Sequence, residues 1–504
     1  MPDLRDGSAI RRWFVAAVLL LLPSALYHDA IAAHYGFRDD YSILRESRDE
    51  PGKVLGWCAS QGRPLYGAVL EATFARLDGV GGLGSARSLS GLAVGLVSVL
   101  AFAALRRARW NEGQSCALAA LLAVLPAAQI DVSWAVCFPH VLGAVAGLGG
   151  FLLAESGGLR QRAGGAALVA AGALFYQPHA LLYVMPVAAG LVARRHDPIA
   201  ARARWVGPHL LTLAAGLGLA FAVVNGLFAA GIAEPSQLWA FDPTPLAKLR
   251  WFASGPLRDA LAMIVLRDEA RGPGPQYWAM AAGVAGAIAI AVLGELRRNG
   301  SRAAGFFVLS AAGLVLASFA ANLIAAERTP KYRTIWALTA VLAVLAVQGL
   351  ETLSEWLPRS RGRLGVAVLA LLALVGAPRA RSQAYDLIAL PQREELALVE
   401  QSVRSPLLRG EPAVFVIHPP PENTAAPLRF EDEFGSLSSA SDWVPVEMFK
   451  AAIEERDPSL CDAPRSCRIA TGLSEPAGGH YDLVIDMRRL RALHGDTDAA
   501  PRNG

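Results

Sequence analysis

Long apolar runs, separated by short polar segments, fill most of the first 380 residues of the chain. A helix that crosses a bilayer needs about 20 apolar residues, with a range of about 17–25. The pattern therefore predicts an α-helical polytopic membrane protein. Runs near the required length predict about eleven transmembrane helices, at 13–33, 88–105, 114–132, 138–154, 164–177, 179–193, 208–230, 276–294, 304–325, 334–353 and 364–377.

Two of these runs meet at Tyr176-Gln177-Pro178-His179. Proline removes a helical hydrogen bond, and irregular backbone at membrane depth occurs only where protein or water covers it. The segment is therefore either two short helices that meet at the outer face or one broken helix.

Arginine placement predicts the orientation, because cytoplasmic connections carry an excess of Lys and Arg. With eleven spans, every short arginine-dense segment falls on one side, which places the N-terminus in the cytoplasm and the C-terminal region outside. We expect a multi-pass protein of the plasma (inner) membrane. The arginines are Arg11, Arg12, Arg106, Arg107, Arg109, Arg160, Arg162, Arg194, Arg195, Arg202, Arg204, Arg297, Arg298, Arg302, Arg359, Arg361 and Arg363.

The first span has two interpretations. Arg11-Arg12 gives it a twin-arginine look, and Ile31-Ala32-Ala33 resembles the cleavage site of an export signal. A chain with ten later spans does not need a removable signal, so we expect an uncleaved anchor.

Composition agrees with a membrane protein: 54% of the residues are hydrophobic, 18% are charged, and the mean hydropathy is +0.36. Soluble domains carry about a quarter charged residues, so a cytosolic enzyme, a disordered scaffold and a disulfide-framework toxin are excluded. The net charge of +4 matters less than where the basic residues lie. Five cysteines, at 58, 116, 137, 461 and 467, are too few and too scattered to predict a zinc or iron–sulfur site.

Three outer segments, at 34–87, 231–275 and 326–333, are candidates to build a site. Residues 65–77 place their apolar side chains on one helical face and are too short to span, which predicts an interfacial helix. Lys248-Leu249-Arg250-Trp251-Phe252 mixes basic and aromatic residues, as helices near lipid headgroups do.

The composition changes after Pro378, and we expect residues 380–504 to form a small outer α/β domain after a membrane module at 1–379. It would contain an amphipathic helix over 380–404, interrupted at Pro391, and a frayed tail after His494. Its predicted strands lie at 413–417, 467–470 and 481–485. Cys461 and Cys467 are close enough in sequence for a local disulfide.

Asp39 and Asp40 lie just past the outer end of the first span. Two adjacent carboxylates disfavour double ionisation, so one should have a raised pKa. Either can act as a general base, or the two can hold a divalent cation such as Mg²⁺ or Mn²⁺ through oxygen ligands. The alternative is a pair of solvated loop aspartates.

Basic residues on the same side suit a phosphate or pyrophosphate anchored in lipid, although ordinary headgroup contacts would need the same residue types. They are Arg63, Arg328, Lys331 and Arg333. Glu71 and Asp131 are weaker candidates for the site. Gln177 and His179 either face an outer cavity or join neighbouring helices.

No Asp, Glu, Lys or Arg lies clearly in the middle of a predicted span. Ion-coupled transporters normally need such residues for their coupling sites, so this pattern argues against that class.

Four features together resemble the GT-C superfamily of integral-membrane glycosyltransferases, and within it the bacterial O-antigen glucosyltransferase-like branch. They are an outer loop that opens with Asp39-Asp40, a helix that begins Gly62-Arg63-Pro64-Leu65, the stretch Phe175-Tyr176-Gln177-Pro178, and the segment Lys331-Tyr332-Arg333. The resemblance covers about residues 10–380 and adds Tyr332 to the candidates.

The resemblance implies transfer of a sugar from a polyprenyl-phosphate-linked donor to a glycan or lipid-linked acceptor, with one of Asp39 and Asp40 as the base. Membrane lipids are the expected surroundings, and no nucleic acid is involved. Two other interpretations stay open: a carrier or flippase for lipid-linked saccharides, and a non-catalytic envelope-assembly protein that works through its outer domain.

Overall fold

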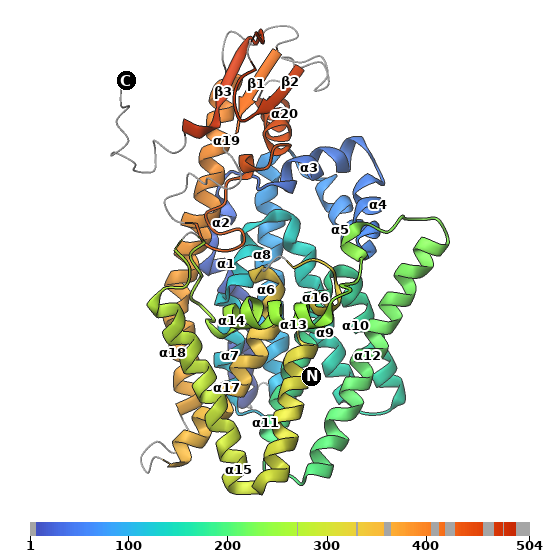
Figure 1. Ribbon diagram of the computed structural model, residues 1–504, viewed down its shortest axis with the longest axis vertical. Coiled ribbons are helices and arrows are strands. Elements are labelled where there is room, and N and C mark those ends of the chain that lie inside the picture. The colour runs from blue at the N-terminus through green and yellow to red at the C-terminus, as the bar shows by residue number, and fades with distance from the viewer. Residues whose placement is uncertain are drawn as a thin grey trace.

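The protein is a bundle of long helices that carries a small sheet at one end (Figure 1). The computed structural model describes residues 7–269, 271–328, 331–356, 364–404, 413–418, 429–456, 468–476 and 478–489. The predicted disulfide between Cys461 and Cys467, the tail after His494, and Arg359, Arg361 and Arg363 lie outside these residues.

The α-helices, in chain order, are α1 (Gly7–Leu26), α2 (His28–Ala32), α3 (Asp39–Asp49), α4 (Lys53–Ser60), α5 (Pro64–Phe74), α6 (Leu83–Arg107), α7 (Glu112–Val124), α8 (Pro126–Ser133), α9 (Phe138–Glu155), α10 (Leu159–Ala180), α11 (Val184–Ala193), α12 (Ile199–Ala229), α13 (Pro245–Ser254), α14 (Pro256–Leu261), α15 (Pro275–Ala317), α16 (Ala320–Ile324), α17 (Trp336–Trp356), α18 (Leu364–Ser382), α19 (Leu390–Val403) and α20 (Val444–Arg456). Shorter helical turns used below are η2 (Ala135–Cys137), η5 (Tyr332–Ile335) and the π-helical η6 (Gln383–Ala389).

Within the described residues, seven helices are long and apolar enough to cross a membrane, or eight if the bent pair α7–α8 counts as one span. The predicted number of about eleven is thus not confirmed by length and composition. Two of the seven contain a break where the sequence predicts separate spans. The backbone leaves helical geometry at Tyr176 in α10 and at Gly300 in α15. Gly300 lies between two predicted apolar runs, and Tyr176 is the second-last residue of the predicted run 164–177.

The helices extend beyond the predicted apolar runs, and these extensions carry charge. Arg202 of α12 and Glu295 of α15 form a buried ion pair with 3.3 Å between nitrogen and oxygen. Arg87 of α6 is also buried and donates to the backbone oxygens of Ala33 and Tyr35. The helices therefore contain more buried charged residues than the apolar runs indicated. Arg87, Arg202 and Glu295 all lie in the helical extensions beyond those runs.

The arginine-rich segments lie together at one end of the bundle, as their ion pairs show. We call this the arginine end. Its salt bridges join segments far apart in sequence: Arg11–Glu112, Arg109–Asp197, Arg195–Glu351 and Arg298–Glu355. The opposite end, which carries α3, α20 and the strands, is called the sheet end (Figure 1). The common location of the arginines is the arrangement that the charge pattern predicted.

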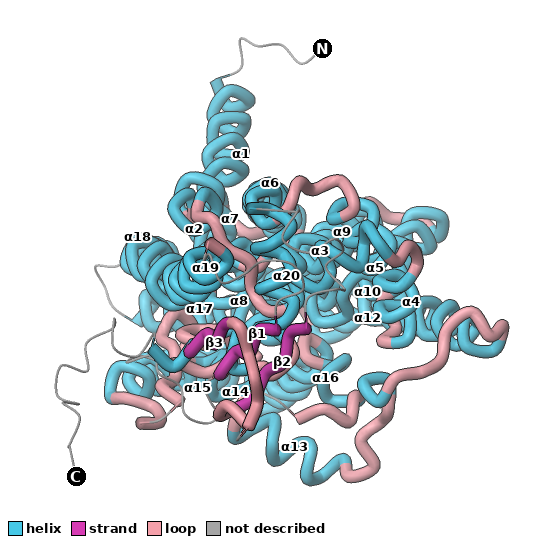
Figure 2. The backbone as a smooth tube through the Cα atoms, turned by 90° about the horizontal axis from the view of Figure 1, so that it is seen from above, coloured by secondary structure: helices cyan, strands magenta, loops and turns pink. Residues whose placement is uncertain are grey.

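The sheet is parallel, with strand order β2-β1-β3. It consists of β1 (Ala413–Ile417), β2 (Arg468–Gly472) and β3 (Leu483–Asp486). The pattern of apolar residues located all three, and β1 agrees with its prediction residue for residue. Viewed from above, the strands lie near α20 and α19 over the end of the bundle (Figure 2).

The boundary expected near residue 380 is not a break in the chain. Helix α18 continues through the π-helical turn η6 into α19, so one helical segment runs from Leu364 to Val403. Pro391 does not interrupt this helix; it lies directly after the π-helical turn η6, where the regular hydrogen-bond pattern has already changed. The C-terminal region is therefore joined rigidly to the bundle.

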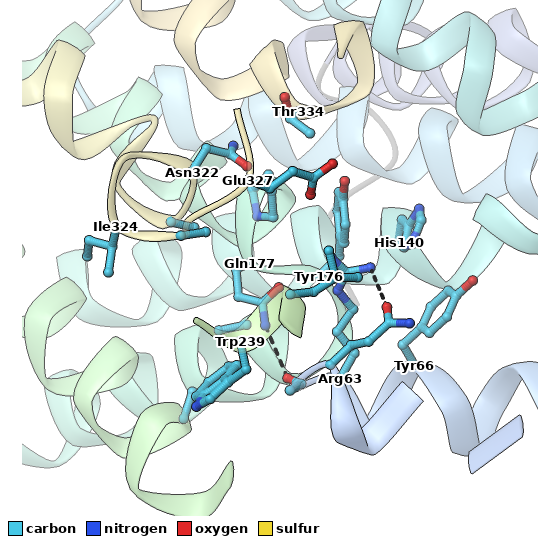
Figure 3. Close-up of a pocket in the computed structure, with 18 of the residues that line it drawn as sticks. Arg63, Tyr66, His140, Tyr176, Gln177, Trp239, Asn322, Ile324, Glu327 and Thr334 are labelled. Atoms are coloured by element: carbon cyan, nitrogen blue, oxygen red, sulfur yellow. Dashed lines mark hydrogen bonds between the residues drawn. The ribbon is translucent and has the colours of Figure 1, made fainter. Parts of the chain in front are cut away.

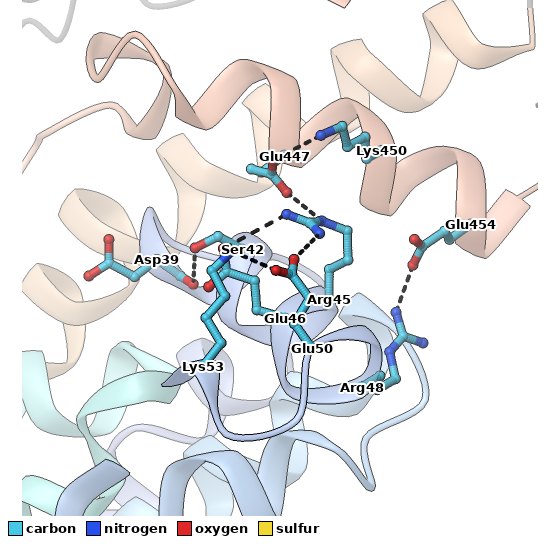
Figure 4. Close-up of polar contacts among 10 residues, drawn as sticks. All are labelled: Asp39, Ser42, Arg45, Glu46, Arg48, Glu50, Lys53, Glu447, Lys450 and Glu454. Carbon is cyan, nitrogen blue, oxygen red and sulfur yellow. Dashed lines mark hydrogen bonds and ion pairs between the residues drawn. The ribbon is translucent and has the colours of Figure 1, made fainter. Parts of the chain in front are cut away.

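Ion pairs also join the C-terminal region to α3 (Figure 4). Arg45 Nε lies 2.8 Å from Glu447 Oε2, and Arg48 lies 2.6 Å from Glu454. Exposed pairs contribute little stability singly, but here several occur along two packed helices. They fix α20 against the helix that begins with Asp39.

Candidate functional site

A cavity of about 610 Å³ opens at the sheet end of the bundle (Figure 3). Four of the eight charged candidates from the sequence line it, namely Asp39, Arg63, Lys331 and Arg333, together with Gln177 and Glu327. They come from the start of α3, the turn before α5, the break in α10 and the segment before α17. The cavity lining thus combines charged residues of both signs with apolar residues of long helices.

Asp39 and Asp40 point in different directions. Asp40 is fully buried, and its two oxygens accept the backbone N–H groups of Phe37 at 2.8 Å and Val136 at 2.9 Å. Asp39 lines the cavity, and within the described residues its carboxylate has no hydrogen-bond partner. Asp39 is therefore the member of the pair that can act on a ligand.

The same geometry bears on the Mg²⁺ or Mn²⁺ site expected at this pair. Both oxygens of Asp40 are already engaged by backbone donors. Asp39 alone offers an uncommitted carboxylate, so the pair does not fit a joint cation site. No step proposed below uses a metal there.

Burial raises the pKa of Asp39, and the charges of Arg333 and Arg38 only partly offset this effect. Burial also raises the pKa of Asp40, to about 7, against the opposing effect of its backbone hydrogen bonds. Both carboxyl groups of the pair thus have a raised pKa, and desolvation by burial is the largest cause for each.

The raised pKa of Asp40 predicts a pH-dependent stability. The folded state holds the Asp40 proton more tightly than the unfolded state does. The protonated Asp40 carboxyl group therefore stabilises the folded state, on the order of 4 kcal/mol in total. This stabilisation is fully present below about pH 4 and is lost as the pH rises through about 7. Thermal unfolding in detergent, measured from pH 4 to 8, should show a smaller loss of stability with rising pH in Asp40→Asn than in the wild type.

Asp49→Asn is the matched control, because Asp49 lies on the same helix and is exposed. It should keep the wild-type pH dependence. An Asp40→Asn protein with an unchanged pH dependence would contradict the role of Asp40.

The four basic candidates separate into two groups. Lys331 and Arg333 line the cavity and pair with Glu327 at 2.8 Å and Glu433 at 3.3 Å. Arg328 does not line it, because its guanidinium is held 2.7 Å from the carboxylate of Asp242. The pairing with Arg328 lowers the pKa of Asp242.

Of the four basic candidates, Arg63 is the one that has no carboxylate partner among the described residues. Its guanidinium lies over the ring of Tyr176, 4.9 Å from the centroid, and its one hydrogen bond within the described part of the chain is a long one of 3.5 Å to Gln61. The preceding Gly62 has φ +78°, and a Cβ there would overlap the ring of Trp239. Glycine is thus required for this turn, which presents Arg63 to the cavity.

The remaining candidates divide between the cavity and structural positions. Gln177 lines the cavity and donates to the Gly62 carbonyl at 3.1 Å (Figure 3). Glu71 accepts the N–H groups of Gly52 and Leu55 and so caps α4. The Tyr332 hydroxyl accepts the N–H of Arg267 at 2.7 Å and does not line the cavity.

Asp131 and His179 form a buried pair with 2.7 Å between Oδ2 and Nε2. Neither lines the cavity, although His140, next to His179, does. The sequence ranked both residues low, and His140 and Cys137 were not considered for the site at all.

A loop of the C-terminal region also contacts residues of the site, and the sequence does not indicate it. Glu433 is buried and lies 3.3 Å from Arg333 and 3.6 Å from Arg38. Burial disfavours its charge, but Arg333, Asp432 and Arg38 outweigh burial and lower the pKa of Glu433. Two acidic residues in an irregular segment give no signal in the sequence that they meet an arginine 100 positions earlier.

The same loop holds the backbone next to Asp39. The Arg38 N–H donates to Ser438 Oγ at 2.8 Å, and its guanidinium donates to Ser436. Arg38 has φ 45° and ψ −107°, a conformation that non-glycine residues rarely adopt and that surrounding contacts must maintain. The C-terminal region therefore positions the cavity carboxylate.

Comparison with models of known protein families and with curated proteins finds no match. The arguments about function therefore rest on the cavity itself.

Proposed function

We propose that this protein is a GT-C-type membrane glycosyltransferase that transfers a sugar from a polyprenyl-phosphate-linked donor. The observation that carries the proposal is the cavity in which one free carboxylate, Asp39, shares a space with Arg63, Lys331 and Arg333. The proposal places the sheet end on the extracytoplasmic side of the plasma (inner) membrane, where the acceptor is a cell-envelope glycan or a lipid-linked saccharide.

The walls of the cavity suit a lipid-linked donor. Helix α12 contributes Leu217, Phe221 and Val224 to the lining, and its other side exposes Leu211 and Leu219. A helix that is apolar on both sides is expected where protein meets lipid. A prenyl chain can therefore lie along α12 while its phosphate reaches the cations.

The proposed reaction is a single displacement at the anomeric carbon. Asp39 takes the proton from the acceptor hydroxyl, and that oxygen bonds to the anomeric carbon as the bond to phosphate breaks. Polyprenyl phosphate leaves with its charge met by Arg63, Lys331 and Arg333. This route inverts the anomeric centre, and Asp39 later releases its proton to water.

The test is transfer by the purified full-length protein in lipid nanodiscs. Polyprenyl phosphates that carry different radiolabelled sugars are supplied with an envelope-glycan extract, and both labelled glycan and free polyprenyl phosphate are measured. The proposal expects the two products in equal amounts. A carrier would move the intact donor between leaflets of a vesicle and release no polyprenyl phosphate, and that outcome would overturn the proposal.

A further inference from the structure

Three metal-ligating side chains converge beside the cavity. Asp131 is on α8, Cys137 ends η2 and His140 is in the first turn of α9. Their ligand atoms lie within 4.8 Å of one another, and all three residues are buried. Because α8, η2 and α9 follow one another directly, a single bend of the backbone brings the three side chains together.

Several polar atoms of this cluster have no hydrogen-bond partner within the described part of the chain. They are Asp131 Oδ1 and both ring nitrogens of His140. Asp131 is 0% exposed and His140 is 4% exposed, so bulk water does not serve them. Buried polar groups are nearly always paired in proteins, and an unpaired group needs an explanation such as a bound ion.

Neighbouring side chains hold two of the three residues in place. Asp131 Oδ2 is 2.7 Å from His179 Nε2, which leaves Oδ1 free to bind a ligand. The His140 ring is stacked between Tyr66 and Tyr176, with centroid distances of 4.7 and 3.9 Å. Outer contacts of this kind orient metal ligands and raise the affinity of a site.

We propose that Asp131, Cys137 and His140 bind a divalent transition-metal ion of the Zn²⁺ class. Thiolate and imidazole ligands favour Zn²⁺, whereas Mg²⁺ and Ca²⁺ prefer oxygen ligands alone. Tetrahedral Zn²⁺ separates its ligand atoms by about 3.3–3.8 Å, so ligand atoms within 4.8 Å of one another need to close by no more than about 1.5 Å. The two anionic ligands balance the charge of the ion.

Cys137 and His140 also line the cavity, so an ion held by the three has access from it. Three protein ligands leave a fourth coordination position for water or a ligand, as in catalytic rather than structural zinc sites. This metal site does not depend on the proposed sugar transfer, because metal binding is measured without any substrate.

The experiment uses the full-length protein, purified in detergent under reducing conditions and stripped of metal with a chelator. Titration with Co²⁺ should give one bound ion per chain and a thiolate-to-Co²⁺ charge-transfer absorption, which Zn²⁺ abolishes by displacement. The absorption should disappear in Cys137→Ser. The Co²⁺ affinity should fall by about 10-fold or more in Asp131→Asn and in His140→Asn.

Cys116→Ser is the matched control, because Cys116 is a free, half-buried cysteine away from the cluster. It should keep both the absorption and the affinity. If Cys137→Ser does not fold, a chain in which Cys137 is the only cysteine replaces it, and that chain should keep the absorption. A wild-type protein without the charge-transfer absorption, or a band that persists in Cys137→Ser, would overturn the proposal.

Discussion

Asp39→Asn is expected to lower the rate of sugar transfer by about 10²–10⁴-fold, the usual contribution of a general base. The amide has the size of the carboxylate but cannot accept the acceptor's proton. The Asp39 carboxylate has no hydrogen-bond partner in the described chain, so the substitution breaks no hydrogen bond. The measurement is the single-turnover rate with saturating donor, together with the thermal unfolding midpoint, which should not fall, because burial disfavours the charge of Asp39.

The control for this experiment is Asp49→Asn, at the exposed end of the same helix α3, which should transfer sugar at the wild-type rate. The pH profile provides a second test. The deprotonated form of Asp39 is the active one, so the rate should rise with pH through the raised pKa of this carboxyl group. The groups that face Asp39 and tune this rise are Arg38, Lys331, Arg333 and Glu433. Full activity in Asp39→Asn would rule out the assigned base.

Arg63→Ala is expected to lower the transfer rate by about 10²-fold or more and to weaken donor binding. The guanidinium meets charge that develops on the departing phosphate, and loss of one such donor typically costs 10²–10³-fold. Arg63 suits this test because, unlike Arg333, it has no carboxylate partner in the described residues that its removal would leave unpaired. Arg63→Lys should restore part of the rate, since it keeps the charge.

Arg328→Ala is the matched control for the cations. This residue belongs to the same sequence motif of boundary cations but pairs with Asp242 and does not line the cavity. It should change the rate by less than about 2-fold, consistent with the small energies of exposed ion pairs. Equal losses in Arg63→Ala and Arg328→Ala would show that general surface charge, rather than the cavity, binds the donor.

The sequence predicted correctly those secondary-structure elements whose conformation depends on residues close together in the chain. Strand β1 is an unbroken run of apolar residues, four of them β-branched or aromatic, and its predicted bounds agree with the structure. The break at Tyr176 follows from the proline two positions later. The arginine-dense segments meet at one end because apolar helices of similar length must place their polar connections at common ends.

The sequence could not separate residues of the same type by role. Asp39 and Asp40 are neighbours in the chain, yet successive residues at the start of a helix point about 100° apart. One therefore enters the cavity, and the other enters the core. Arg328 and Arg333 are divided in the same way by the carboxylates that happen to face them.

The sequence by itself thus determined that the chain is helical and apolar enough for a membrane, that its arginine-dense segments gather at one end, and that a small sheet follows the bundle. These properties depend on residues that are near one another in the chain. Only the tertiary structure decided that Glu433 meets Arg333, that one aspartate of the pair is available to a ligand, and that Cys137 lies beside Asp131 and His140. Such contacts depend on how distant segments pack, and packing is set by the sum of many weak apolar contacts that no single motif records.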